Sequence, residues 1–199
     1  MDSERFKKQL DFILEIDKEK NILRQTHLSG HGRRENDAEH AWHMAIMIYL
    51  LKEYANREIN VGKAMMMALI HDVVEIDAGD TYAYDATGAI TQKEREEKAA
   101  KRIFGLLPTE QKEELKALFE EFEANETAEA QFARAMDNFQ PLLLNNSNGG
   151  SDWREHGVYK DQVLKRHSIT GLGSKEIGDY SNKLIEENVN KGNIKDGPH

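Results

Sequence analysis

The chain of 199 residues contains no cysteine, and this absence excludes two kinds of structure. It can form neither a disulfide nor a thiolate metal site, so any metal ion must bind imidazole nitrogens and carboxylate oxygens. The absence also suits a reducing compartment, and we expect a cytoplasmic protein.

Long apolar runs are absent as well. Residues 1–9 are polar and charged and contain no apolar core of a signal peptide. The most apolar stretch, Ala64–Val74, is shorter than the roughly 20 residues that cross a bilayer, and it contains His71 and Asp72. We therefore expect no membrane-spanning segment.

Positive charge is scarce. Lys and Arg number 27 against 36 Asp and Glu, which gives a formal net charge of −9. Long nucleic acids bind through concentrated positive charge, so the composition argues against such a partner. A small phosphorylated ligand is compatible with it, because that ligand needs only a metal ion and one or two cationic side chains.

Apolar residues at helical spacing dominate what is present. The first predicted helix carries them on one face: Phe6, Leu10, Ile13 and Leu14. A second helix begins at Asn36 or Asp37. A third, almost wholly apolar, runs from Asn60 to Gly79 and is expected to be buried on most sides.

The second half of the chain is also helical. Thr91 and Glu94 form a capping box for a fourth helix, which ends near Gly105. A fifth helix covers residues 115–122. A sixth begins at Thr127, and Pro141 kinks or ends it.

Two more helices are expected near residues 158–167 and 174–190, and no strand pair is expected. The pattern predicts an all-α helical bundle. We expect one domain over residues 1–199, with a core at about 21–145, the C-terminal helices packed on it, and a frayed tail at 192–199.

His71 and Asp72 interrupt the most apolar predicted helix. An ionised Asp in such surroundings is costly unless it is paired or binds a metal ion. Successive helical residues diverge by about 100°, so both side chains can reach an ion at the helix edge. Glu75 follows them by four and three positions and overhangs the same face.

Two further polar residues occupy core-like positions. His40 begins the second helix, with His43 three residues later on the same face, and Asp137 lies in an apolar helical run. Taken alone, each also fits a hydrogen-bonded core residue, and Asp137 also fits a pair with Arg134 or Arg95. Together, two imidazoles and two carboxylates suit a divalent metal ion with positions left for water and substrate.

The order of His40, the pair His71-Asp72 and the distant Asp137 resembles the HD-domain superfamily of metal-dependent phosphohydrolases. Two longer strings, residues 35–40 and 71–80, are similar to those of the branch that contains the bacterial 5′-deoxynucleotidases. The resemblance covers about residues 21–145. It implies an HD-domain helical bundle in which these two His and two Asp residues bind one divalent ion.

The resemblance also implies roles for residues around the ion. Glu75 acts on the water near the phosphate, Asp80 lies at the sugar end and helps proton transfer, and Arg24 grips the phosphate. Gln25 stands where the deoxynucleotidases carry a Trp against the sugar 2′ position, so deoxyribose selectivity is not part of the prediction.

Two more residues are candidates for substrate binding. Arg34 precedes the helix of His40, where it can meet an anion or remain a solvated loop residue. His43 is a phosphate donor or a packed helix residue. Trp42 and Trp153 are interpreted as packing residues.

The expected function is hydrolysis of a small phosphorylated substrate, a nucleoside 5′-monophosphate, with one divalent ion of Mn, Co, Fe, Ni, Zn or Mg. Three alternatives remain. They are hydrolysis of another phosphate ester on the same fold, a di-iron oxygenase in which His43 and Glu75 help to bind a second metal, and a nucleotide-binding module without catalysis. By analogy with relatives, a homodimer is the expected assembly.

Overall fold

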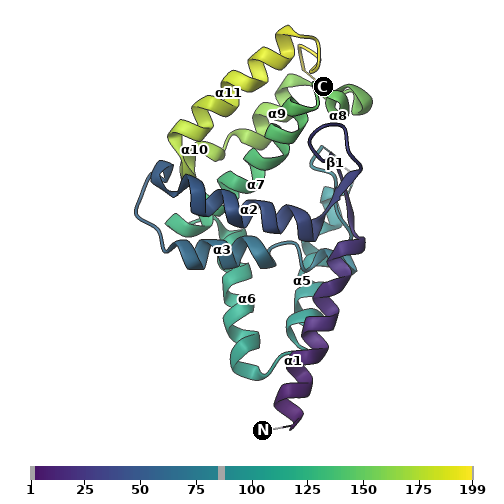
Figure 1. Ribbon diagram of the computed structural model, residues 1–199, viewed down its shortest axis with the longest axis vertical. Coiled ribbons are helices and arrows are strands. Elements are labelled where there is room, and N and C mark those ends of the chain that lie inside the picture. The colour runs from purple at the N-terminus through teal and green to yellow at the C-terminus, as the bar shows by residue number, and fades with distance from the viewer. Residues whose placement is uncertain (1–2, 85–87, 199) are drawn as a thin grey trace.

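A computed structural model of the chain describes residues 3–84 and 88–198. The described residues are predominantly helical, and the two termini lie at opposite ends of the long axis (Figure 1). The helices, in chain order, are α1 (Ser3–Ile16), η1 (Asp17–Asn21), α2 (Asp37–Leu51), η2 (Lys52–Tyr54), α3 (Val61–Ile70), α4 (Glu75–Ala78), α5 (Ala89–Phe104), α6 (Thr109–Ala124), α7 (Ala128–Ser147), α8 (Ser151–His156), α9 (Lys160–His167), α10 (Thr170–Gly173) and α11 (Lys175–Asn190). The prediction of an all-α bundle is confirmed.

A short strand pair was not predicted. β1 (Leu23–His27) pairs antiparallel with β2 (Arg34–Asn36), with Leu23 opposite Asn36 and an irregularity before His27. Both strands are short and mostly polar, so they lack the alternation of apolar residues that marks a strand in sequence. The hairpin brings β1 beside the start of α2.

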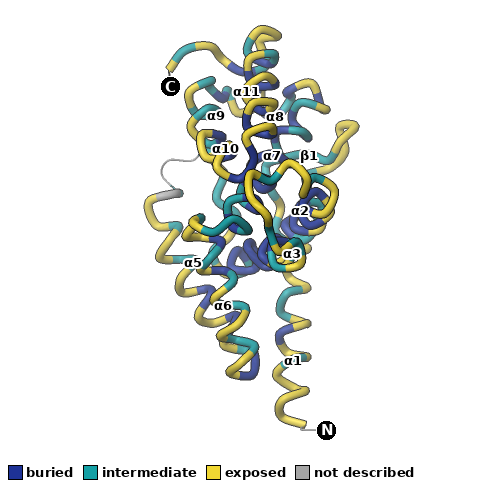
Figure 2. Tube along the Cα trace, turned by 90° about the vertical axis from the view of Figure 1, so that its left-hand side faces the viewer, coloured by how far each residue is buried: buried dark blue, intermediate teal, exposed yellow. Residues whose placement is uncertain are grey.

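The buried side chains form two clusters. The larger one joins α2, α3 and α7 to the C-terminal helices, and α2, α3 and α7 are dark blue over much of their length in Figure 2. The smaller one joins the end of α3 to α1, α5 and α6, and it includes Ile70 and Val73. Ala68 belongs to the larger cluster and Ile70 to the smaller one, so His71 and Asp72 directly follow the part of α3 where the two clusters meet.

The apolar helix from Asn60 does not run through to Gly79, as predicted. Asn60 caps it as expected by accepting from the Lys63 N–H at 3.1 Å, but α3 ends at Ile70. Residues 71–74 form turns before the single turn of α4. His71 and Asp72 therefore occupy a break between two helices rather than the middle of one.

Two other helix boundaries differ from the prediction. The start of α5 is Ala89 and not Thr91, because the Thr91 hydroxyl lies 3.3 Å from Arg95 Nε within the helix and does not cap it. Pro141 does not end α7, which continues to Ser147. Part of the predicted 80–88 loop, residues 85–87, lies outside the described residues.

The C-terminal segment is not a free tail throughout. Ile194 is only 1% exposed, and Lys195 exchanges backbone hydrogen bonds with Val158 and Lys160, each 2.9 Å long. This contact ties the chain end to the start of α9. No helix among the described residues is long and apolar enough to cross a lipid bilayer.

Candidate metal centre and pocket

His40 is placed by the first turn of α2. Asn36 caps this helix, with its side chain accepting from the Glu39 N–H at 2.9 Å while the Glu39 carboxylate accepts from the Asn36 N–H at 3.2 Å. His40 follows directly and is fully buried. The capping box thus fixes the helix end that carries this imidazole.

Gln140 determines which nitrogen of His40 faces the site. The Gln140 amide nitrogen donates to Glu35 at 2.6 Å, so its oxygen must be the atom that lies 3.0 Å from His40 Nδ1. His40 Nδ1 then carries the proton and donates. His40 Nε2 is the nitrogen left to face Asp137 Oδ1, at 3.3 Å.

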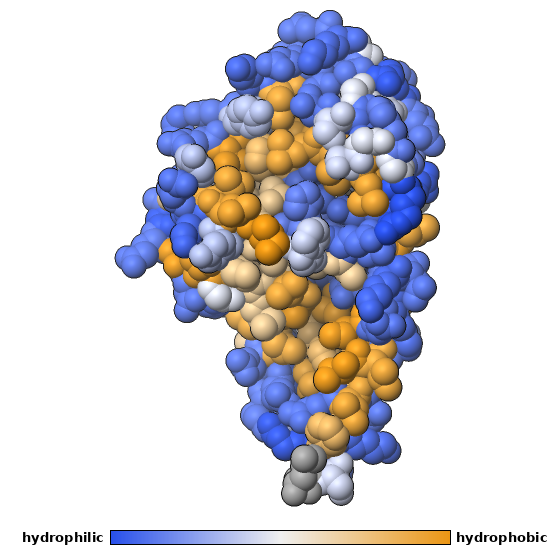
Figure 3. All heavy atoms as spheres, viewed as in Figure 1, coloured by the Kyte–Doolittle hydropathy of each residue, from blue (hydrophilic) through white to orange (hydrophobic). Residues whose placement is uncertain are grey.

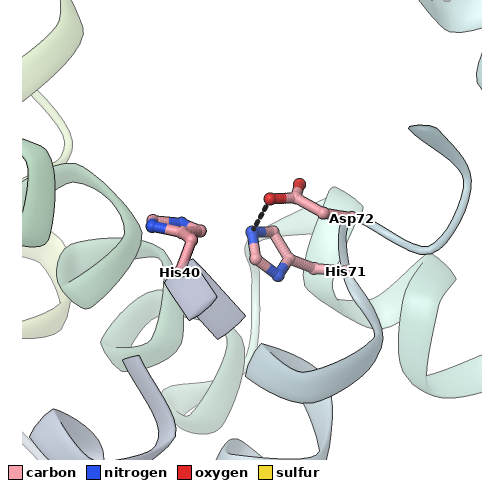
Figure 4. A group of neighbouring side chains, drawn as sticks. All are labelled: His40, His71 and Asp72. Carbon is pink, nitrogen blue, oxygen red and sulfur yellow. Dashed lines mark ion pairs between the residues drawn. The ribbon is translucent and has the colours of Figure 1, made fainter. Parts of the chain in front are cut away.

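His71 is held in the same way. A backbone carbonyl can only accept, so His71 Nδ1 donates to the Ala68 carbonyl at 2.8 Å. His71 Nε2 has no hydrogen-bond partner among the described residues, yet it lies 3.0 Å from Asp72 Oδ2. Figure 4 shows the His71 ring turned toward Asp72, with His40 opposite.

These donor atoms fit a divalent cation. One donor atom each from His40, His71 and Asp72 lies within 4.8 Å of the others, and Asp137 Oδ1 is 3.8 Å from His71 Nε2. Two unprotonated nitrogens facing two carboxylate oxygens repel each other unless a cation or a proton lies beside them. Burial and the Arg24 charge lower the pKa of His40, but its contacts with Asp137 and Glu35 outweigh them and raise the pKa to about 9. Without a metal ion, a proton on Nε2 therefore takes the place that the cation would have between His40 and Asp137.

Asp137 stays ionised because cations surround it. Arg166 Nη2 lies 3.2 Å and Arg134 Nη1 3.5 Å from its Oδ2 atom. Burial alone raises the pKa of Asp137. Arg166 and the contact with His40 lower this pKa by more than burial raises it, so it lies well below its usual range. The sequence offered Arg134 as a partner three residues away. Arg166, on α9, gave no local signal.

Arg24 reaches the metal centre from β1. Its Nη1 atom lies 2.7 Å from Asp72 Oδ2 and 3.3 Å from Asp37 Oδ1. The side chain is 12% exposed, and Asp37 is fully buried. Arg24 is thus a cation at the pocket wall, anchored by one carboxylate outside the predicted ligand set.

Glu75 is a buried acid beside the same centre. It begins α4, and its N–H donates to the Asp72 carbonyl at 2.8 Å. Burial and the charges of Asp72 and Asp37 raise the pKa of Glu75 far above its usual range, although Arg24 opposes them. Asp80 follows after the left-handed Gly79 and also lines the pocket.

One pocket gathers most of the predicted residues. Arg24, Gln25, Asp80 and Glu75 line it together with His71, Asp72 and Asp137. Its empty space, including the mouth, is about 1050 Å³. The wall also contains residues that sequence reasoning did not assign to the site: Thr26, Tyr82, Tyr84, Asn138, Asn145, Arg166 and His167.

The predicted or discussed residues outside that lining are His40, His43, Arg34 and Trp42. His43 Nδ1 accepts from the Gln140 amide at 3.1 Å and so belongs to the network behind His40. Arg34 is half-buried in β2. Trp42 is 62% exposed and so is not the packing residue expected, whereas Trp153 is buried as expected and lines the pocket.

Comparison with known proteins places this fold and site in a family. A family model described as HD domain matches residues 16–177. The chain belongs to the HD domain family, which confirms the resemblance read from its motifs.

Individual relatives carry more specific names. A human protein named 5′-deoxynucleotidase HDDC2 is 33% identical over 111 residues, which are 56% of this chain and 53% of the human one. The Xenopus laevis protein of that name is 36% identical over 110 residues, or 55% of this chain and 53% of that one. The chain thus spans about half the length of these curated relatives.

A solved structure matches almost the whole chain. It is a predicted metal-dependent phosphohydrolase from Magnetospirillum magnetotacticum MS-1, with 49% identity and a TM-score of 0.91. The match covers 96% of this chain and 95% of that one. A conserved hypothetical protein from Pyrococcus furiosus is 25% identical with a TM-score of 0.60, over 90% of this chain and 98% of its own.

Proposed function

We propose that the protein is a metal-dependent phosphohydrolase that removes the phosphate of a nucleoside 5′-monophosphate. The observation that carries the proposal is the convergence of His40 Nε2 and His71 Nε2 on the carboxylates of Asp137 and Asp72. These groups lie beside a pocket that also contains Arg24 and Glu75. The names of the relatives support the nucleotide as substrate.

His40, His71, Asp72 and Asp137 would hold one divalent ion. Bound there, the ion would neutralise phosphoryl oxygens and lower the pKa of a water molecule. Imidazole and carboxylate ligands accept Mn, Co, Fe, Ni, Zn or Mg, and availability and geometry decide between them.

Arg24 would bind the non-bridging oxygens of the phosphate. Its guanidinium faces Asp72 at 2.7 Å in the structure, and Asp37 remains as a buried counter-ion at 3.3 Å when the phosphate takes the place of Asp72. Guanidinium pairs with phosphate through two parallel hydrogen bonds, which adds orientation to charge stabilisation.

Glu75 would orient the attacking water and exchange a proton with it. Its Oε2 atom is buried and has no hydrogen-bond partner among the described residues, so the atom is available to a water molecule. Asp80 lies further along the same wall and would protonate the leaving oxygen at the sugar end. Gln25, next to Arg24, would contact the sugar.

Release of inorganic phosphate tests the proposal directly. The protein is stripped of metal, single divalent ions are added back, and ribo- and deoxyribonucleoside 5′-monophosphates are supplied. We expect metal-dependent release that Asp72→Ala abolishes, because this substitution removes a ligand and the partner of His71. Asp179→Ala is the matched control, since Asp179 is exposed on α11 and pairs only with Lys175 among the residues described.

Full activity of metal-free Asp72→Ala protein would exclude this mechanism. Tight nucleotide binding without turnover, with every metal, would favour the nucleotide-binding module instead. No second group of metal donors is found among the described residues, and His43 is engaged by Gln140, so no observation favours the di-iron oxygenase.

A second copy of the chain is the proposed partner. Figure 3 shows an apolar surface over α1, α2 and α3. Its exposed large side chains, here called the apolar face, are Phe6, Leu10, Ile13, Leu14, Trp42, Ile46, Tyr49, Leu50, Met66 and Leu69. Apolar surface of this extent is unusual on a monomer.

A further inference from the structure

Besides His71 Nε2 and Glu75 Oε2, three buried polar atoms in the pocket wall have no hydrogen-bond partner among the described residues. They are Asn138 Oδ1, Asn145 Oδ1 and His167 Nδ1, and none forms a hydrogen bond with any described residue. Their side chains belong to residues only 2%, 7% and 7% exposed. A buried polar atom without a partner costs about 1–3 kcal/mol, so three in one wall require an explanation.

The amide of Asn145 has a defined orientation. Its Nδ2 atom donates to the Pro141 carbonyl at 2.8 Å, and turning the amide over would set two oxygens against each other. The unpartnered atom is therefore an acceptor. The Asn138 amide is placed more loosely, with its nitrogen 3.5 Å from the Thr170 hydroxyl.

His167 approaches from α9 and also offers an acceptor. Burial and the adjacent Arg166 charge lower its pKa to about 4, although Asp137 opposes them, so the ring is neutral near pH 7. A neutral imidazole carries one proton, and Nδ1 accepts a hydrogen bond when that proton is on Nε2. The pocket wall thus presents acceptors from two helices.

Asn138 and Asn145 lie on α7, the helix that carries Asp137. Asn138, Leu142 and Asn145 follow one another at spacings of four and three, so they share a face of α7. Asn145 is eight residues beyond Asp137, or about 12 Å along the axis. Leu142 and Pro141 supply apolar wall between the two ends. A ligand with its phosphate at Asp137 would present its far end to Asn145.

We infer that Asn138, Asn145 and His167 form the subsite for the nucleoside half of the substrate and that this subsite selects an N–H or O–H donor, the exocyclic amino group of the base. This assignment rests on the nucleotidase function proposed above. The base fits the requirement better than the sugar, because Asn145 lies two helical turns from the phosphate end. A carbonyl in place of the amino group would face an acceptor and be disfavoured.

Paired substrates that differ in this one group test the inference. Deoxyadenosine monophosphate is compared with deoxyinosine monophosphate, and deoxycytidine monophosphate with deoxyuridine monophosphate. We expect kcat/KM to favour the amino member of each pair by about 10-fold or more, as one hydrogen bond in a buried site allows. Asn145→Leu should reduce this ratio to near one. Asn182→Leu, on the exposed side of α11, should leave it unchanged.

Binding without turnover separates the subsite from the reaction. Calorimetry with deoxyadenosine and deoxyinosine, which carry no phosphate, should show the same preference and its loss in Asn145→Leu. If that preference is present while no nucleotide is hydrolysed, the subsite stands and the nucleotidase function fails. If Asn145→Leu does not fold, His167→Phe removes another of the three acceptors and is expected to lower the same ratio.

Two results would overturn the base assignment. One is efficient hydrolysis of all four nucleotides with ratios near one in the unaltered protein. The other is an equal loss in Asn145→Leu on deoxyribose 5-phosphate, which has no base and would place the contact on a sugar hydroxyl.

Discussion

At the scale of single residues, the candidate metal centre depends on a group outside the four proposed ligands. Gln140 uses its whole amide: the oxygen accepts from His40, and the nitrogen donates to Glu35 and His43. The Gln140 amide can therefore adopt only one orientation in this hydrogen-bonded network. Gln140, 100 positions away in the sequence, therefore determines which His40 nitrogen faces the site.

Gln140→Leu should weaken metal binding while leaving all four ligands in place. Leucine leaves the His40 Nδ1–H without an acceptor, and loss of such a partner typically lowers metal affinity by about 10- to 100-fold. Calorimetric titration of the stripped protein with Mn²⁺ or Co²⁺ measures it. Gln111→Leu removes a surface bond to Gln9 far from the pocket and serves as the control. An unchanged affinity would show that Gln140 only packs.

Glu19 is expected to make stability fall as pH rises. It is 6% exposed, and burial together with the charges of Asp72 and Asp37 raises its pKa to about 8. The unfolded chain loses this proton near pH 4.5, so between there and pH 8 the folded state binds more protons than the unfolded one. The Glu19 contribution is thus complete at low pH and is lost as pH rises through this window.

Glu19→Gln should remove that slope. The expected change is on the order of 1 kcal/mol per pH unit within the window, measured as the free energy of unfolding in urea with a chelator present. Between pH 5 and pH 8, the free energy of unfolding of the variant should increase relative to that of the unaltered protein. Parallel curves for the two proteins would show that Glu19 is ionised in the folded state.

The candidate ligands could be predicted from the sequence, because a charged or imidazole side chain within an apolar helical pattern is recognised from its immediate sequence neighbours. His40, His71, Asp72 and Asp137 were all found that way. Arg166, Asn145 and His167 could not be, since nothing near them in the chain marks them as pocket residues. They become pocket residues only because α9 packs against α7 in the folded structure.

At the scale of helices and strands, local signals predicted starts better than ends or strands. Asn36 and Thr127 cap α2 and α7 as predicted, because a side-chain cap is satisfied within four residues. The break after Ile70 was missed, because the apolar pattern continues through Val73 and Ile76. The hairpin was missed because its pairing partners lie on different segments.

Asn36→Ala should destabilise the protein and disturb the metal centre together. Loss of an N-cap costs about 1 kcal/mol, and this cap sets the first turn that holds His40. Urea denaturation and metal titration measure the two effects. Asn60→Ala removes the cap of α3, at the opposite end of that helix from His71, and should cost similar stability with metal affinity kept. If both variants changed metal affinity equally, the effect of Asn36→Ala would not come from the position of this cap beside His40.

At the scale of the whole molecule, the proposed pairing of two copies through the apolar face would account for the exposure of the apolar side chains of α1. Phe6, Ile13 and Leu14 are 45%, 56% and 70% exposed, and Figure 2 shows much of α1 in yellow. Sequence periodicity placed these residues on one face correctly. It could not tell whether the face packs within the chain or against another molecule.

Leu50→Glu should convert a dimer into a monomer. Leu50 is 62% exposed within the apolar face, and a buried, unpaired carboxylate at a subunit contact is strongly unfavourable. Sedimentation equilibrium measures the mass. Ile90→Glu should leave the mass unchanged, because Ile90 is 81% exposed on α5, a helix that lies on the opposite side of the molecule from α2 and α3 (Figure 2). A monomeric unaltered protein would contradict the proposed assembly.

The anchoring of Lys195 at the start of α9 has a practical consequence for handling the protein. The same short helix carries Arg166, which contacts Asp137, and His167, which lines the pocket. A purification tag or a truncation placed just after Asn193 would act on that helix directly. The N-terminus lies at the opposite end of the long axis from α9 (Figure 1), so an addition there leaves the contact between Lys195 and α9 in place.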